Sequence, residues 1–328
     1  MKNEENIVYK LIGKDYDYRT IVARDNSRGH GSNLSVKIVI PSYCQANCPF
    51  CFNHLTKDTQ MHDYNLFLDN LDKSLKLIMN NINERGVSLN VTGNEPTFNI
   101  FLLMKFMNHI KLYKDKVAHV ILTTNGFRLY DCIDYMNGAV DIVNISTHHY
   151  DYGKRKKIFG TSSIPNDEEI KKIIVKLKDN NISATAVSVL YEDVGDFRKF
   201  YDKYTNWAMN LGFKDVRMRS NFYSDDKFID DYLKMDFPKQ SMNKLNGLTT
   251  KIIIDEKTGF ETRLLKGVPD LTEHVLGAEL VIDDDGKCYI DYNKRYLVDE
   301  DNIQYFNKFY VLDKDRKEKT KIRKLTLK

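Results

Sequence analysis

Long apolar runs are missing from this sequence, and so is a secretory signal. No stretch of eighteen or more apolar residues occurs, so the sequence predicts no membrane-spanning helix. The first six residues, MKNEEN, lack the apolar core that a signal peptide needs. We therefore expect a cytoplasmic protein, and that compartment keeps thiols reduced.

An excess of charge of one sign is also missing. The formal net charge is +4, which is weak evidence about partners. The basic excess lies in residues 313–328, where a solvated terminus is the ordinary interpretation. Aromatic residues do not alternate with the basic ones there, so binding of single-stranded nucleic acid is not predicted. Hydrophobic residues make up 42% of the 328 residues and charged residues 29%, as in an ordinary globular enzyme.

Cysteine is scarce, yet three of the five cysteines stand within eight residues, as Cys44, Cys48 and Cys51. Their C-x3-C-x2-C spacing follows the β-branched run 36–40. Clustered cysteines in such a chain indicate a metal site or catalysis more than disulfides, and a bridge within the loop would leave an odd thiol. Three thiolates leave one iron of an iron–sulfur cube open to another ligand. A zinc site with His54 as the fourth ligand and a chance cluster of buried thiols are the alternatives.

A second motif, Gly93-Asn94-Glu95-Pro96, follows the strand-like segment 87–92. Gly93 permits a tight turn and a close approach of the backbone. Glu95 places an anionic acceptor at the end of a strand, where it can bind an ammonium group. Taken alone, such a string indicates only a turn.

Together the two motifs resemble those of the radical SAM superfamily. Phe50 stands where the family has an aromatic residue before its third cysteine, and Asn94 replaces the second glycine of the family's Gly-Gly-Glu-Pro motif. A third string, Thr123-Thr124-Asn125-Gly126, resembles the branch that contains the molybdenum-cofactor and peptide-modifying enzymes. The resemblance covers roughly residues 34–222, a length that suits a partial barrel.

Strand-like and helix-like segments alternate over that range, which predicts an α/β partial (β/α)6 TIM-like barrel. Its chemistry is expected at the carboxyl ends of the strands. We expect residues 1–33 to be peripheral, 34–222 to form the barrel, and 223–328 to form a small β-rich extension covering the barrel mouth. The expected strands are 34–40, 87–92, 118–123, 140–146, 182–190 and 214–219. The expected helices are 64–82, 98–113, 168–179 and 196–211, and the expected hairpins are 251–264 and 279–290.

The resemblance implies two cofactors, a 4Fe-4S cluster and S-adenosylmethionine (SAM). It assigns the cluster to Cys44, Cys48 and Cys51. Only two cysteines lie beyond this loop, so the seven-cysteine extension that holds auxiliary clusters in many peptide-modifying relatives is absent, and one cluster is expected. The residues that the resemblance places near SAM are Phe50, Gly93, Asn94, Glu95, Thr123, Asn125 and Ser146.

Other residues are weaker candidates, each with a structural alternative. His148 and His149 follow the fourth strand, and at most one of them is expected to face the site. Arg217 and Arg219 share one face of the sixth strand, which suits a carboxylate or phosphate, or else a partly exposed surface. Cys288 could return a hydrogen atom to a substrate radical, but an inert strand thiol is the alternative. Val189 and Leu190 are expected to pack in the core.

The expected function is that of a radical SAM oxidoreductase. The resemblance implies reductive cleavage of SAM to a 5′-deoxyadenosyl radical, with electrons from a donor such as flavodoxin or ferredoxin. The radical would abstract hydrogen from a small metabolite or from a peptide, with a ribosomally made peptide as the first choice, in an epimerisation or crosslinking reaction. Two alternatives stay open. One is a nucleotide-derived substrate, and the other is a zinc-binding interaction module without catalysis.

Overall fold

The computed structural model describes most of the chain and forms two β-sheets, of eleven and three strands. None of the helices in the described part is long and apolar enough to cross a membrane. The described residues are 21–24, 33–51, 63–190, 194–220, 227–245, 248–267, 273–276, 279–290, 297–307 and 309–313.

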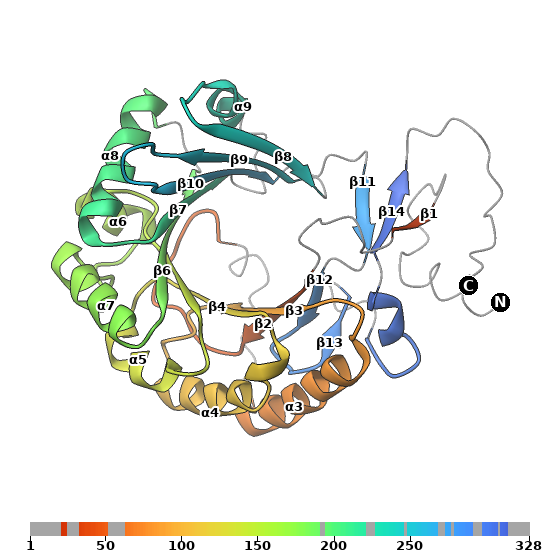
Figure 1. Cartoon of the computed structure of the whole chain (residues 1–328). Helices are drawn as coiled ribbons and strands as arrows, with labels where there is room; N and C mark the ends of the chain where they lie inside the picture. The colour runs from red at the N-terminus through yellow and green to blue at the C-terminus, as the bar shows by residue number, and fades with distance from the viewer. Residues whose placement is uncertain are drawn as a thin grey trace.

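The larger sheet has a continuous parallel core that curves into an open barrel (Figure 1). Its six central strands follow one another in chain order, and each pairs in parallel with the next. All their carboxyl ends therefore meet at one rim. These strands are β2 (Leu34–Ile40), β3 (Val87–Gly93), β4 (His119–Thr124), β5 (Ile142–Ser146), β6 (Ser183–Leu190) and β7 (Asp215–Ser220).

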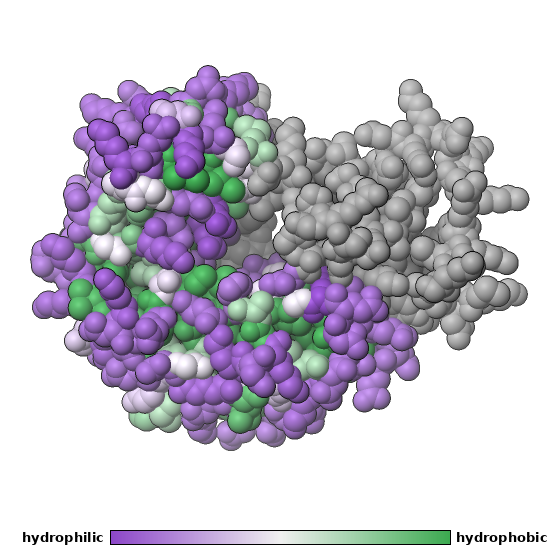
Figure 2. All heavy atoms as spheres, in the orientation of Figure 1, coloured by the Kyte–Doolittle hydropathy of each residue, from purple (hydrophilic) through white to green (hydrophobic). Residues whose placement is uncertain are grey.

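Helices cover the outer, convex face of this sheet (Figure 1). Hydrophilic side chains dominate the visible surface, with smaller hydrophobic areas between them (Figure 2). The outer helices are α3 (Tyr64–Asn81), α4 (Ile100–Lys111), α5 (Leu129–Met136), α6 (Tyr152–Phe159), α7 (Asp167–Asp179) and α8 (Phe197–Leu211). Two 3-10 helices, Lys114–Lys116 and Ile303–Asn307, and α9 (Lys227–Lys234) complete the helical elements of the described residues.

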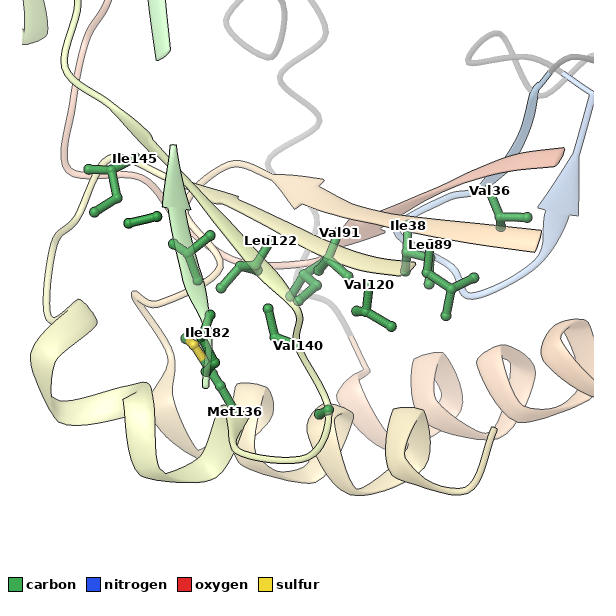
Figure 3. Close-up of a cluster of buried hydrophobic side chains, with 14 of the residues drawn as sticks. Val36, Ile38, Leu89, Val91, Val120, Leu122, Met136, Val140, Ile145 and Ile182 are labelled. Carbon is green, nitrogen blue, oxygen red and sulfur yellow. The ribbon is translucent and has the colours of Figure 1, made fainter. Parts of the chain in front are cut away.

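The core lies between the sheet and the outer helices. In β2 and β3, alternate residues such as Val36, Ile38, Leu89 and Val91 are fully buried on the helix side (Figure 3). Alternation along a strand places the intervening residues on the opposite, inner face. That inner face is polar, as the hydrogen bond from Asn90 Nδ2 to Ser35 Oγ illustrates, at 3.0 Å.

Strands from the last third of the chain extend both edges of the barrel sheet. At one edge β10 (Glu261–Gly267) pairs in parallel with β7, and it continues antiparallel into β9 (Leu248–Ile254) and β8 (Gln240–Leu245). At the other edge β12 (Glu279–Ile282) pairs in parallel with β2 and antiparallel with β13 (Cys288–Tyr289). The small sheet joins β1 (Ile21–Arg24), β14 (Phe309–Asp313) and β11 (Glu273–Leu276).

The partial barrel expected from the sequence is confirmed. Each of the six expected strands is present, and so are the four expected helices, with ends that differ by a few residues. Both expected hairpins form, but their strands β10 and β12 continue the barrel sheet. Covering of the barrel mouth by residues 223–328 stays a prediction. The eight-residue helices α5 and α6 are not among the expected elements. Helix α6 carries four Lys or Arg residues and a glycine, and so shows little helical periodicity.

Candidate functional site at the carboxyl rim of the barrel

The cysteine loop begins where β2 ends, and backbone hydrogen bonds hold it at the rim. The Glu95 amide donates to the Tyr43 carbonyl at 3.1 Å, which fixes the loop against the turn after β3. The Asn47 amide donates to the Phe159 carbonyl at 2.7 Å, which fixes it against the end of α6. The loop is thus held from two directions by elements that are far apart in the sequence.

The turn after β3 approaches the end of β2 so closely that only glycine fits. Gly93 has a φ of 136°, and a Cβ there would lie 2.6 Å from the Ile40 carbonyl oxygen. Beside it, Asn94 Nδ2 donates to the Ser42 carbonyl at 2.5 Å. The motif of residues 93–96 therefore packs directly on the strand end that leads into the cysteines.

The Glu95 carboxylate is buried and bound within the protein. Its Oε1 accepts from the Thr97 amide at 3.1 Å and from the hydroxyls of Thr97 and Thr124, and its Oε2 accepts from the Asn125 amide at 2.7 Å. Burial raises the pKa of Glu95, while these hydrogen bonds act in the opposite direction. The side chain thus ties the turns after β3 and β4 together. Its contact with the amino group of SAM stays a prediction.

Asn125 joins the third motif to the first. Its Nδ2 lies 3.6 Å from Cys44 Sγ and 3.4 Å from Gln45 Oε1, and its Oδ1 accepts from Gln45 Nε2 at 3.1 Å. Gln45 also donates to the Ser163 carbonyl at 3.0 Å. The three sequence motifs consequently form one hydrogen-bonded assembly at the rim.

The three thiols of the loop suit a cube-type cluster as ligands. Cys44, Cys48 and Cys51 are all half-buried and free of disulfides. Burial raises the pKa of Cys44 to about 11 and that of Cys48 to about 12, and the charge of Cys51 adds to both shifts. Iron must therefore displace protons when it binds, as metals do at thiol sites.

The described residues contain no single-ion site. Among them, no three His, Cys, Asp or Glu side chains are placed to hold one metal ion. A cube does not require such convergence, because each of its thiolate ligands binds a different iron. His54, the fourth ligand in the zinc interpretation, lies outside the described residues.

His148 packs against the cysteine loop as a neutral, buried side chain. Its ring meets that of Phe50 edge-on, with centroids 4.9 Å apart, and its Nδ1 accepts from the Val189 amide at 3.1 Å. Burial, together with the charge of Arg219, lowers the pKa of His148 to about 3. His149 instead packs on Tyr150, with ring centroids 4.4 Å apart, and its Nδ1 accepts from the Asp151 amide.

The remaining candidates divide between the two faces of the sheet. Thr123 accepts from Asn144 Nδ2 at 3.3 Å, and Ser146 ends β5 two residues after Asn144, so these residues share the inner face. Arg217 and Arg219 also lie on the inner face, because Val216 before them and Met218 between them are fully buried on the helix side.

Cys288 lies on the helix side. It pairs with Ile282 of β12, and Ile282 is in register with Ile38 of β2. The thiol is 1% exposed within the main apolar core, and burial raises its pKa. This position is that of a core thiol and gives no support to a role as hydrogen donor. Val189 and Leu190 are buried, as expected for core residues.

Two site residues, Thr97 and Gln45, were missed from the sequence. The Thr97 hydroxyl is fully buried, donates to Glu95, and contacts Thr124 and the Phe127 carbonyl oxygen. The available signal was position alone, because Thr97 follows the Gly93–Pro96 motif directly and Gln45 lies inside the cysteine loop.

A cavity of about 500 Å³ lies behind this rim, between α5 and the loop that joins α6 to α7. Its walls include Arg128, Tyr130, Tyr152, Ser163 and Lys172, and none of the three loop cysteines. It touches the site through Ser163, the partner of Gln45, and through Gly126 and Phe127 at the end of the third motif.

Several solved structures are similar to this chain at low sequence identity. SuiB of Streptococcus suis bound to S-adenosylmethionine is 11% identical with a TM-score of 0.52, covering 80% of this chain and 61% of that one. SuiB bound to its precursor peptide SuiA is 14% identical with a TM-score of 0.46, and the match covers 63% of this chain and 42% of that one. The protein anSMEcpe with bound AdoMet is 19% identical with a TM-score of 0.45, and the match covers 59% of this chain and 53% of that one. The chain thus spans less than two thirds of the length of each of these structures.

A family model adds a match at the sequence level. No curated protein matches the chain. Residues 38–203, which include the cysteine loop and every motif described above, match the family model described as Radical SAM superfamily. Members of that family are enzymes that use a 4Fe-4S cluster and SAM. The match extends over half of the sequence, and the chain belongs to the radical SAM superfamily.

Proposed function

We propose that this chain is a radical SAM enzyme with one 4Fe-4S cluster, held by Cys44, Cys48 and Cys51. Held by these thiolates, the cluster would supply the chemistry of reductive SAM cleavage, with hydrogen abstraction from a C–H bond of the substrate and with methionine and 5′-deoxyadenosine as products. A small one-electron donor of the flavodoxin or ferredoxin type, in the reducing cytoplasm, supplies the electron.

One observation carries this proposal: the hydrogen-bonded assembly that joins the three motifs. Asn125 links the turn after β4 to Cys44, and Glu95 links the same turn to the one after β3. Three motifs that are far apart in sequence thus surround one place at the rim. Neither a zinc module nor a chance group of thiols accounts for the second and third motifs.

The residues around the thiols are suited to binding SAM beside the cluster. The backbone of Gly93 and Asn94 is held close to the loop, because no side chain fits between Gly93 and Ile40. Phe50, Thr123 and Ser146 border the same rim, and the last two lie on the inner face of the sheet. We propose that SAM binds beside the cysteine loop and the turns after β3 and β4, on the inner-face side of the sheet.

We propose a peptide as the substrate, either ribosomally made or otherwise, with epimerisation or crosslinking as the reaction. SuiB, which shares the fold at a TM-score of 0.52, binds a precursor peptide called SuiA. The polar inner face of the sheet is compatible with a hydrated, hydrogen-bonding substrate such as a peptide. A small metabolite is the alternative within the same chemistry.

The test is anaerobic reconstitution with iron and sulfide, followed by reduction with dithionite in the presence of SAM. We expect about four irons per chain and formation of 5′-deoxyadenosine. Replacing Cys44, Cys48 and Cys51 together by alanine should abolish both. The matched control is Cys132→Ala, which removes a buried thiol of α5 that is not part of the cysteine loop and should retain both.

Two results would overturn the proposal. One is a colourless protein that keeps zinc after reconstitution, which favours the interaction module. The other is a fully reconstituted, reduced protein that yields no 5′-deoxyadenosine. An iron content that is unchanged in the triple alanine variant would remove these cysteines as ligands.

A further inference from the structure

The last two parallel strands of the sheet carry three arginines on the inner face. Arg217 and Arg219 belong to β7, and Arg263 belongs to β10. On β10 the neighbours Thr262 and Leu264 are buried on the helix side, which places Arg263 on the inner face. All three side chains therefore face the region that the rim motifs border.

The register of these strands places like charges side by side. Arg217 lies directly opposite Arg263. Two residues earlier on each strand, Asp215 lies opposite Glu261. Like charges in such positions destabilise a sheet. If sheet stability alone determined these residues, we would expect charges of opposite sign at facing positions.

Ion pairing inside the protein leaves Arg217 unsatisfied. Arg263 Nε pairs with Glu261 Oε1. Arg217 is half-buried, and among the described residues neither an ion pair nor a hydrogen bond is found for it; its Nε is shielded from solvent and without a partner. Burial lowers the pKa of its guanidinium, although Asp215 and Glu261 oppose that shift. A buried N–H donor without a partner is costly, and an anion that accepts from this Nε would remove the cost.

The two arginines that face each other indicate what kind of ligand fits. Arg217 Nε has no partner among the described residues, and Arg263 is paired with Glu261 through Nε. A guanidinium has five N–H donors, so both groups retain donors for an anion. The proposed peptide supplies carboxylates, and the flat guanidinium matches their two-pronged geometry.

The site is well placed to hold a substrate near the rim. Ser146, Val187, Arg217 and Arg263 form one row across four neighbouring strands. Adjacent strands are about 4.8 Å apart, so Arg217 lies roughly 10 Å from Ser146 along this row. An anchored group at that distance leaves a neighbouring part of the substrate within reach of the SAM site.

We propose that Arg217 and Arg263 bind a carboxylate of the substrate peptide, either an acidic side chain or its C-terminus. This inference rests on the proposed function, because it takes the substrate to be a peptide. Through these arginines, β7 and β10 would orient the peptide relative to the rim.

The test uses arginine labelling by phenylglyoxal, read by peptide mass spectrometry, on reconstituted protein with SAM. The probe is N-acetyl-glutamate, and the matched neutral probe is N-acetyl-glutamine. We expect the first to protect Arg217 and Arg263 and the second to leave them reactive. Titration calorimetry with N-acetyl-glutamate should show affinity lowered about tenfold or more in Arg217→Gln. The control is Lys37→Gln, which removes an inner-face cation already paired with Glu279, and should change affinity less than about twofold.

Three outcomes would overturn the inference: equal protection by both probes, an unchanged affinity in Arg217→Gln, or protection by inorganic phosphate alone, which favours a nucleotide-derived substrate. Labelling does not depend on catalysis, so the two proposals can fail separately. Protection without 5′-deoxyadenosine formation contradicts the proposed function alone. Formation of 5′-deoxyadenosine without selective protection contradicts the carboxylate site alone.

Discussion

At the scale of single residues, His148 connects the cysteine loop to the far strands of the barrel. It contacts Phe50 with its ring and binds the Val189 amide through Nδ1. Its backbone has a φ of 61°, a region that asparagine and histidine tolerate better than most residues. A histidine that must accept a hydrogen bond in a buried place has to remain neutral there.

This requirement predicts an acid-sensitive stability. The folded pKa of His148 is about 3 and the unfolded value 6.5, so its contribution is complete above pH 6.5 and is lost as pH falls toward 3. Between pH 7.5 and 5.5, wild type should lose roughly 1 kcal/mol of unfolding free energy more than His148→Asn, whose amide oxygen can still accept from Val189. Urea titrations of cofactor-free protein at both pH values measure this difference. The same pH dependence in both proteins would contradict the assignment.

The sequence identifies the residues of the site better than their contacts. The thiols, the Gly93 turn and Asn125 stand in recognisable motifs, so they can be found without a structure. The contact of Asn125 with Cys44 and that of Glu95 with Thr124 join segments that are 81 and 29 residues apart. Such pairings depend on the register of β2, β3 and β4, which local patterns do not determine.

At the scale of elements, the turn after β3 determines how the cysteine loop is placed. Gly93 is in register with Ile40, the last residue of β2. Its positive φ and its contact with the Ile40 carbonyl both require a residue without a side chain.

We expect Gly93→Ala to cost about 3 kcal/mol or more of unfolding free energy, since β2 must shift to admit the methyl group. The matched control is Gly138→Ala, because Gly138 also has a positive φ, of 73°, but no atom lies within 4 Å of the added Cβ. Backbone strain alone should then cost about 1 kcal/mol. Denaturant unfolding of both variants separates crowding from strain. Equal losses would show that the close approach to β2 is unimportant.

Elements with strong local patterns were predictable, and weakly patterned ones were not. The barrel strands alternate buried and half-buried residues, and helices such as α7 begin with a capping box formed by Asn166 and Glu169. Helix α6 has little apolar periodicity, and its buried Arg155 is held by Asp167 and the Tyr150 carbonyl. Tertiary contacts of this kind leave no periodic signal in the sequence.

At the scale of the whole molecule, the barrel sheet continues past residue 222 through β10 and β12, and the domain bounds 34–222 stay a prediction. The β12 residues Leu280 and Ile282 are fully buried beside β2, and Gly286 fits directly against α3, where a Cβ would lie 2.3 Å from the Phe67 carbonyl oxygen. Ser74 of α3 also donates to the Gly286 carbonyl at 2.8 Å. The expected hairpins could be read from the sequence, but their pairing with β2 and β7 could not, because it joins segments distant along the chain.

We therefore expect a chain limited to residues 33–222 to lose cooperative unfolding. It lacks several buried side chains, each worth about 2–5 kcal/mol, which together approach the whole stability of a typical domain. Thermal and urea unfolding followed by circular dichroism, with the full chain as control, measures the effect. A cooperative transition in the shortened chain would show that the expected boundary is a true domain boundary.

The pairing of β12 with β2 also has a consequence for the order of events during synthesis. Ser35 and its partner Glu279 are separated by 244 residues. At bacterial or eukaryotic rates of translation, roughly 10–50 s pass between the appearance of the two. Throughout this interval the outer edge of β2 is open to other strands, and the cysteines that follow it have an incomplete support. Stable insertion of a cluster would consequently come after the synthesis of β12, when that strand has paired with β2.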